Sequence, residues 1–166
     1  MRLEFGGGET PKRPEFTQVD VRKITDDTIV CNAWDIDKHV EPNTVTEIYS
    51  RHFFEHLTFA QGEKVLDVWK TILVPGGKCE MLLPNLTFHI NQWVNLREDP
   101  KSEEWAKAGF WGWQRGDLED TWDVHKSGYD ATSLFQLLIA KDYKDIESLK
   151  SDKSKNIHVR FFKEKG

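Results

Sequence analysis

Short apolar stretches alternate with glycine, proline and acidic residues along the first half of the chain. Four of them have the length and the β-branched or aromatic composition of strands: residues 3–5, 16–20, 28–34 and 45–50. The third stretch runs into Asp35-Ile36-Asp37, so we expect that strand to end in acidic residues. Pro42 and Asn43 predict a turn before the fourth strand.

Apolar residues then recur at helical spacing over residues 59–73, which predicts a helix. Pro75-Gly76-Gly77 predicts a turn that ends this helix and leads into a fifth strand at 78–83. Strands joined by such connections form a largely parallel sheet with right-handed crossovers, so the pattern predicts an α/β fold.

The second half of the chain begins with a less regular segment. Residues 87–129 contain five of the seven tryptophans: Trp93, Trp105, Trp111, Trp113 and Trp122. Such a cluster indicates a satellite core, a lid over a ligand or a partner surface. Asp130 can then cap a helix that extends to about Ala140, and residues 144–149 and 157–162 predict an antiparallel hairpin at the edge of the sheet. We expect one domain over residues 1–166, with an irregular Trp-rich insertion at about 87–129.

The composition excludes several classes of protein. A net charge of −5 and a pI near 5.7 argue against a general nucleic-acid binder, whose phosphate contacts need a basic surface. Cys31 and Cys79 are isolated, without the paired spacing of a zinc site, and indicate free thiols in a reducing compartment. The sequence shows no signal peptide and no apolar stretch that approaches a membrane span. We expect a cytoplasmic protein with no nucleic-acid and no membrane partner.

A glycine run directly follows the first strand, at residues 6–8, and Asp20 ends the second strand. Glycines at the carboxyl end of a strand let the backbone approach a ligand where a Cβ would clash. An acid at the tip of the next strand can accept hydrogen bonds from both hydroxyls of a ribose. Together these features predict a nucleotide-cofactor site.

Four stretches in order resemble the class I S-adenosylmethionine-dependent methyltransferases, and in particular a compact group without the first crossover helix: residues 3–8 with 19–22, residues 48–57, residues 69–77 leading into 81–86, and residues 123–129. The resemblance implies a Rossmann-like, mostly parallel sheet with an antiparallel C-terminal edge hairpin, and S-adenosylmethionine as the cofactor. It implies an enzyme that methylates a small-molecule acceptor, such as a sugar or another metabolite. The acceptor would lie against residues 87–129, which could also form the contact of a homodimer.

The resemblance also assigns cofactor contacts to nine residues: Glu4, Gly6, Gly8, Asp20, Asp35, Ile36, Ser50, Arg51 and His52. Glu4 and the glycine backbone would approach the methionine moiety, whose ammonium suits a carboxylate. Asp20 would accept hydrogen bonds from the ribose, and Asp35 with Ile36 would contact the adenine. Residues 50–52 would line the face at which the methyl group is transferred.

Two features depart from the family's pattern. Thr10 and Pro11 follow the glycines, where the family usually has another small residue. The seven residues from Glu9 to Glu15 are fewer than the dozen or so that a parallel crossover normally needs. We therefore expect no helix N-terminus beneath the cofactor at this point.

A hydroxyl acceptor must lose a proton, so we expect a general base, with His125 as the first candidate and His52 as the second. Residues 52–56 also match H-x-x-E-H, a zinc-hydrolase motif that requires both histidines to lie on one helix. Because this segment directly follows a strand, we expect no bound metal. A non-catalytic cofactor-binding or assembly module on the same fold is the alternative function.

Overall fold

The computed structural model describes residues 1–95, 100–114, 123–150 and 153–166, and these form a seven-stranded sheet in the order β3-β2-β1-β4-β5-β7-β6. The strands are β1 (Arg2–Phe5), β2 (Thr17–Asp20), β3 (Ile29–Val30), β4 (Val45–Arg51), β5 (Leu73–Pro84), β6 (Lys144–Ser148) and β7 (Asn156–Phe162). The first five strands pair in parallel, whereas β7 runs antiparallel to β5 and β6 antiparallel to β7. The predicted α/β sheet with an antiparallel C-terminal hairpin is confirmed. No helix separates β1 from β2, as predicted.

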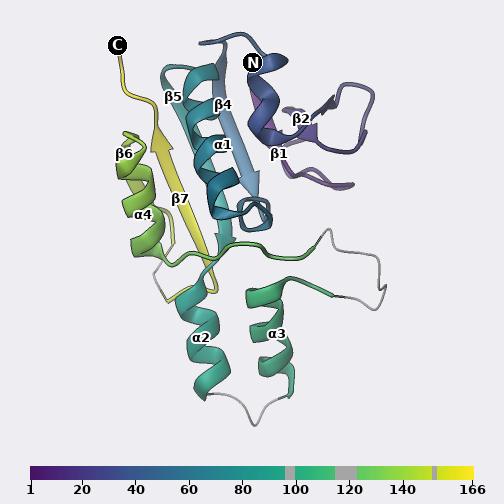
Figure 1. Cartoon of the computed structure of the whole chain (residues 1–166), viewed down its shortest axis with the longest axis vertical. Helices are drawn as coiled ribbons and strands as arrows, with labels where there is room; N and C mark the ends of the chain where they lie inside the picture. The colour runs from purple at the N-terminus through teal and green to yellow at the C-terminus, as the bar shows by residue number, and fades with distance from the viewer. Residues whose placement is uncertain (96–99, 115–122, 151–152) are drawn as a thin grey trace.

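Two α-helices, α1 (Phe59–Ile72) and α4 (Ala131–Ala140), lie against one face of the sheet beside the 3₁₀-helix η1 (Ala33–Lys38) (Figure 1). Capping boxes fix where both α-helices begin, one from Thr58 to Gln61 and the other from Asp130 to Ser133. A second pair, α2 (Leu86–Asn95) and α3 (Pro100–Trp111), extends beyond the carboxyl ends of β4 and β5 (Figure 1). Among the described residues, no helix has both the length and the apolar composition needed to span a membrane.

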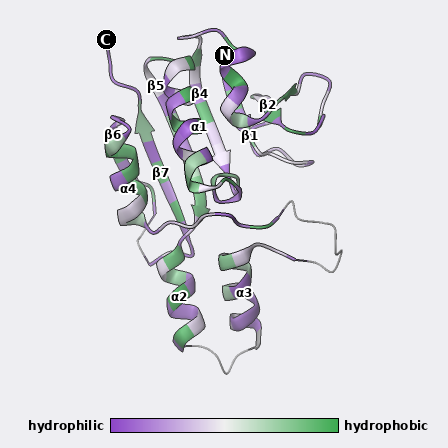
Figure 2. Ribbon diagram, viewed as in Figure 1, coloured by the Kyte–Doolittle hydropathy of each residue, from purple (hydrophilic) through white to green (hydrophobic). Residues whose placement is uncertain are grey.

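The core lies between the sheet and these two helices. Trp69 of α1 packs against Phe5 of β1 with ring centres 5.0 Å apart, and both side chains are fully buried. Residues alternate between the core and the opposite face along β7, which therefore appears banded in green and purple in Figure 2.

The opposite face of the sheet is polar. Glu4 lies beside Gln18 and Tyr49, and Glu80 follows in the next strand. The loop between β1 and β2 covers this row, because the Arg13 guanidinium lies 3.7 Å from the Glu80 carboxylate and 4.8 Å from the centre of the Tyr49 ring. A short loop thus covers the polar row in the absence of a first crossover helix.

The third predicted strand is wrong in its extent. Only Ile29–Val30 is a strand, and the acidic segment that follows forms η1. The reason is a helical spacing of apolar residues, since Ala33, Ile36 and Val40 are all buried in the core.

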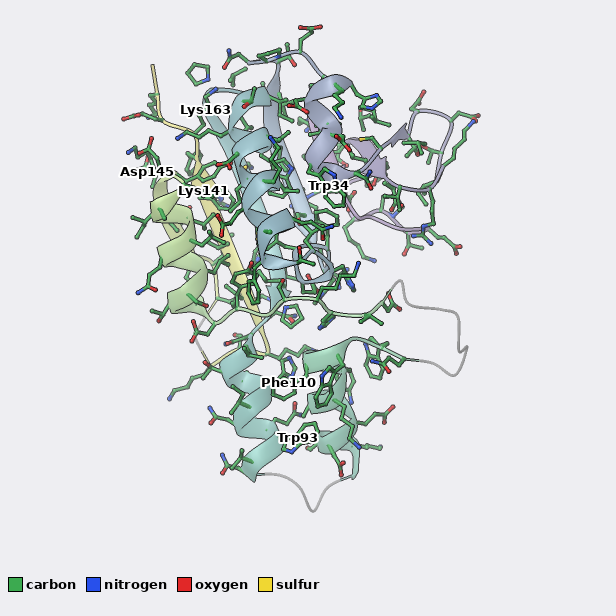
Figure 3. All side chains as sticks on the ribbon, in the orientation of Figure 1. Trp34, Trp93, Phe110, Lys141, Asp145 and Lys163 are labelled. Atoms are coloured by element: carbon green, nitrogen blue, oxygen red, sulfur yellow. The ribbon has the colours of Figure 1, made fainter. Side chains whose placement is uncertain are left out.

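The Trp-rich segment is more regular than predicted, because it contains α2 and α3. Trp93 of α2 packs edge-to-face on Phe110 of α3, with ring centres 5.7 Å apart (Figure 3). Trp111 also contacts Trp93, at 5.3 Å. Trp122 lies outside the described residues.

The turn predicted at Pro75-Gly76-Gly77 lies inside β5. Gly76 has a φ of 74°, which favours glycine, and the pairing of β4 with β5 is irregular between Val45 and Glu47. The predicted turn thus appears as an irregularity in the pairing of β4 with β5, within one continuous strand.

Candidate active site

Two cavities meet at the carboxyl ends of the parallel strands, where open α/β sheets bind ligands. We call the first the glycine cavity, because Gly6 and Gly8 line it; its volume is about 510 Å³. The second, the tryptophan cavity, has a volume of about 440 Å³ and is lined by the side chains of α3 and by His125. His52, His56 and Asp123 line both cavities and so form the wall between them.

The glycine run places backbone where a side chain would intrude. Gly6 and Gly8 have φ values of 68° and 57°, a conformation that favours glycine. No atom lies within 4 Å of the position that a Cβ of Gly8 would occupy. The space beside Gly8 is therefore open, and the predicted approach of a ligand to this backbone stays a prediction.

Asp20 ends β2 at the edge of the glycine cavity. Its Oδ1 accepts a hydrogen bond from the backbone N–H of Arg22 at 3.0 Å, and the Arg22 Nε lies 3.4 Å away. These contacts hold the carboxylate at the strand end, the position predicted for a ribose contact.

Glu4 does not line either cavity. Its carboxylate is buried on the polar face, where the backbone N–H groups of Lys12 and Arg13 donate to Oε1 and Oε2, both at 2.9 Å. Gln18 Nε2 donates to Oε2 at 3.0 Å. The structure therefore shows Glu4 as the anchor of the loop between β1 and β2, and its contact with a methionine moiety stays a prediction.

Four other predicted contact residues also lie outside the glycine cavity, namely Asp35, Ile36, Ser50 and Arg51. Asp35 sits in η1, where its hydrogen bond with Lys38 lowers the pKa of the carboxyl group. Ile36 and Ser50 are fully buried, and Ile36 is part of the core. The strand that was expected to carry Asp35 to the site ends five residues earlier, at Val30.

The end of β4 brings Arg51 and His52 to the cavities. Arg51 lines the tryptophan cavity, and His52 lines both. His52 has a φ of 47°, an unfavourable conformation for a residue with a Cβ, and such strain is concentrated at functional sites. Its Nδ1 lies 3.1 Å from Oε1 of the buried Glu55.

His125 packs beside His56, with ring centres 5.0 Å apart. The Nδ1 of His125 lies 3.1 Å from the backbone oxygen of Gly109, and the Nδ1 of His56 lies 3.2 Å from that of Val124. Because a carbonyl oxygen only accepts, each ring donates from Nδ1. Burial lowers the pKa of His125, which favours its neutral form.

Solved structures of S-adenosylmethionine-dependent methyltransferases share the fold of this chain. The chain aligns with one from Archaeoglobus fulgidus at a TM-score of 0.65 and 13% identity, over 98% of this chain and 85% of that one. It aligns with a methyltransferase from Methanosarcina mazei at a TM-score of 0.61 and 13% identity, over 97% of this chain and 89% of that one. For human N-acetylserotonin methyltransferase in complex with S-adenosylmethionine the values are a TM-score of 0.61 and 14% identity, over 98% of this chain and 47% of that one. No protein-family model and no curated protein matches the sequence.

This chain has the fold of the class I S-adenosylmethionine-dependent methyltransferases. At these identities the likeness establishes the fold alone.

Within this methyltransferase fold, the glycine cavity has a wall that the sequence did not reveal. It consists of Cys31, Asn32, Ala33 and Trp34, which follow β3. Trp34 is half-buried against the core, and Figure 3 shows it beside α1. Trp34 lies in η1, four residues after β3 ends, whereas the sequence pattern predicted it as the last residue of the strand.

Asp123 and Lys126 also line the glycine cavity and were not predicted to do so. The backbone N–H groups of Lys126 and Ser127 both donate to the backbone oxygen of Glu55, at 2.8 and 3.1 Å. These bonds carry the segment before α4 across the strand ends, a long-range contact that no local pattern encodes.

Proposed function

We propose that this chain binds S-adenosylmethionine in the glycine cavity and methylates a small molecule that occupies the tryptophan cavity. The observation that carries this proposal is the shared wall of His52, His56 and Asp123, because methyl transfer needs two ligands in contact across one boundary. Both volumes lie in the range of small-molecule sites.

The residues of the glycine cavity suit this cofactor. The turn at Gly6 and Gly8 leaves room for the methionine moiety, and Asp20 can accept hydrogen bonds from the ribose. Trp34 offers an aromatic surface for the adenine in place of the predicted Asp35 and Ile36. When bound, the cofactor supplies an activated methyl group, so the protein contributes mainly alignment of the reactants.

The tryptophan cavity suits a polar acceptor with a flat face. Trp105 and Trp113 provide apolar area, while Arg51 and Lys155 provide positive charge. The Lys155 Nζ lies 5.0 Å from the centre of a Trp105 ring, a cation–π distance. We infer that the acceptor is a small hydroxyl-bearing compound, of which a sugar or another polar metabolite is an example.

A hydroxyl acceptor gives up its proton during the transfer. His52 is the better placed of the two predicted bases, because it lines both cavities and has a carboxylate behind it. His125 lines only the tryptophan cavity, so its role is confined to the acceptor side.

Asp20→Ala tests the cofactor site, with Asp35→Ala as a matched control. Loss of a charge-assisted pair of ribose contacts should cost about 1.5–3 kcal/mol, a change of roughly 10- to 150-fold in the dissociation constant. Titration calorimetry with S-adenosylhomocysteine measures it, and Asp35→Ala should leave the affinity within about twofold of the wild type. Equal effects of the two substitutions, or no effect of Asp20→Ala, would contradict the proposed site.

Release of S-adenosylhomocysteine from S-adenosylmethionine in the presence of a panel of polar hydroxyl compounds tests catalysis. Acceptor-dependent release supports an enzyme. Cofactor binding without turnover on any of them would favour the non-catalytic module.

A further inference from the structure

The tryptophan cavity is lined by three neighbouring side chains of metal-binding character. Glu55, His56 and His125 each offer one ligand atom, and these atoms lie within 4.8 Å of one another. All three residues line the tryptophan cavity. We propose that they bind one divalent transition-metal ion, with Zn²⁺ as the probe, and that the ion orients the oxygen of the acceptor.

Both histidines are prepared to act as ligands. Their Nδ1 atoms donate to the backbone oxygens of Val124 and Gly109, which leaves the lone pair of each ring on Nε2. A hydrogen bond from the second ring nitrogen to a carbonyl is the usual way in which a metal-binding histidine is oriented. These backbone hydrogen bonds orient the two rings, whose centres lie 5.0 Å apart.

Glu55 provides the independent evidence for a cation. The residue is only 1% exposed, and its Oε1 is occupied by the Nδ1 of His52 at 3.1 Å. Its Oε2 is buried and has no hydrogen-bond partner among the described residues. A buried carboxylate oxygen without a partner is unfavourable, and a bound cation would satisfy it.

The donor set selects the class of ion. Two imidazoles and one carboxylate with an open fourth position are typical of catalytic zinc sites and suit other first-row transition metals, whereas Mg²⁺ and Ca²⁺ prefer oxygen ligands alone. A tetrahedral Zn²⁺ holds its ligand atoms about 3.4 Å apart, so the three side chains need to close by at most about 1.4 Å. The remaining position would face the tryptophan cavity, which all three residues line.

This set differs from the H-x-x-E-H motif in the sequence. That motif pairs His52 with His56 on one helix, but residues Phe54–His56 form a 3₁₀-helix, η2, and His52 lies before it with a positive φ. In the structure, His125 lies beside Glu55 and His56 as the third member of the cluster. His52 instead contacts the carboxylate of Glu55. The sequence predicted no bound metal. His125 lies 69 positions beyond His56, so no short motif in the sequence contains both residues.

The test is a titration of the full chain, freed of metal with a chelator, with Zn²⁺ alone by calorimetry. We expect one ion per chain, and at least about a hundredfold weaker binding in His125→Gln and in Glu55→Gln. Two control variants should bind as the wild type does: His39→Ala, an exposed histidine, and His89→Gln, which lines the same cavity outside the triad. Wild-type protein that binds no Zn²⁺, or that loses it in His89→Gln and not in His125→Gln, would overturn the proposal. Circular dichroism of each variant shows that it is folded.

Binding of the ion does not require the methyltransferase activity, but its role toward the acceptor rests on the proposed function. Parallel titration with S-adenosylhomocysteine separates the two. If the protein binds S-adenosylhomocysteine but does not bind Zn²⁺, the metal site is refuted and the proposed function stays intact. If the protein binds Zn²⁺ but does not bind S-adenosylhomocysteine, the metal site is supported and the proposed function is refuted.

Discussion

The Glu4 carboxylate either anchors the loop between β1 and β2 or binds the cofactor. The substitution Glu4→Gln distinguishes these two roles. The carboxylate is 1% exposed and accepts hydrogen bonds at both oxygens, from the backbone N–H groups of Lys12 and Arg13 at 2.9 Å each. A glutamine has the same shape but only one oxygen. At least one of the two backbone donors would therefore face an NH₂ group that cannot accept.

The expected loss of stability follows from these contacts. A hydrogen bond to a charged group contributes about 1.5–3 kcal/mol, and a buried donor left unpaired adds a penalty of about 1–3 kcal/mol. We expect the free energy of unfolding to fall by about 3 kcal/mol in Glu4→Gln. In a chain of 166 residues this lowers the melting temperature by roughly 6–12 °C.

Thermal unfolding followed by circular dichroism measures the change, with Glu9→Gln as the control, because Glu9 is an exposed glutamate of the same loop. Glu9→Gln should melt with the wild type. At 20 °C, where Glu4→Gln is still folded, its affinity for S-adenosylhomocysteine should change by less than about threefold. An unchanged melting temperature together with a large loss of affinity would refute the reasoning, since the carboxylate would then bind the cofactor and not the loop.

Two further predictions concern the tryptophan cavity. The double substitution Trp111→Ala and Trp113→Ala should spare cofactor affinity and reduce acceptor turnover, because Trp113 lines this cavity and Trp111 packs on α2; joint loss of both would show that the segment is core. Burial lowers the pKa of His89, so the unfolded chain takes up a proton there more readily than the folded chain below about pH 6.5. The free energy of unfolding should therefore fall between pH 7 and pH 5, and fall less in His89→Gln; identical pH profiles would contradict this.

Local patterns predicted the parts of the fold that local physics determines. The α1 helix was predicted from its apolar stripe and the α4 helix from its apolar stripe and the capping residue Asp130. The α3 helix was missed because its sequence is polar on average and its tryptophans suggested a lid. It is a helix because Trp105 and Trp111 each pack on another tryptophan, contacts that no sequence pattern encodes.

The sequence predicted those parts of the candidate site in which a residue of a particular type directly follows or ends a strand. The glycine turn and Asp20 follow their strands directly, so their place at the cavity follows from the strand pattern alone. Glu4 was assigned differently because strand alternation places it on the face opposite Phe5, and what covers that face depends on the path of the loop. The triad with His125 required the segment before α4 to cross the strand ends, which only the folded chain shows.

The loop between β1 and β2 links the polar face of the sheet to the glycine cavity. A parallel sheet normally has helices on both faces, and here residues 6–16 contribute no helix over β1, β4 and β5. Arg13 instead reaches Glu80 and Tyr49, and Glu4 binds the backbone of the same loop. The cover is thus held by hydrogen bonds and charge, which a few residues can supply, and not by apolar packing, which needs a longer helix. Because the same loop begins with the glycine turn, these contacts also fix the backbone against which the cofactor would lie.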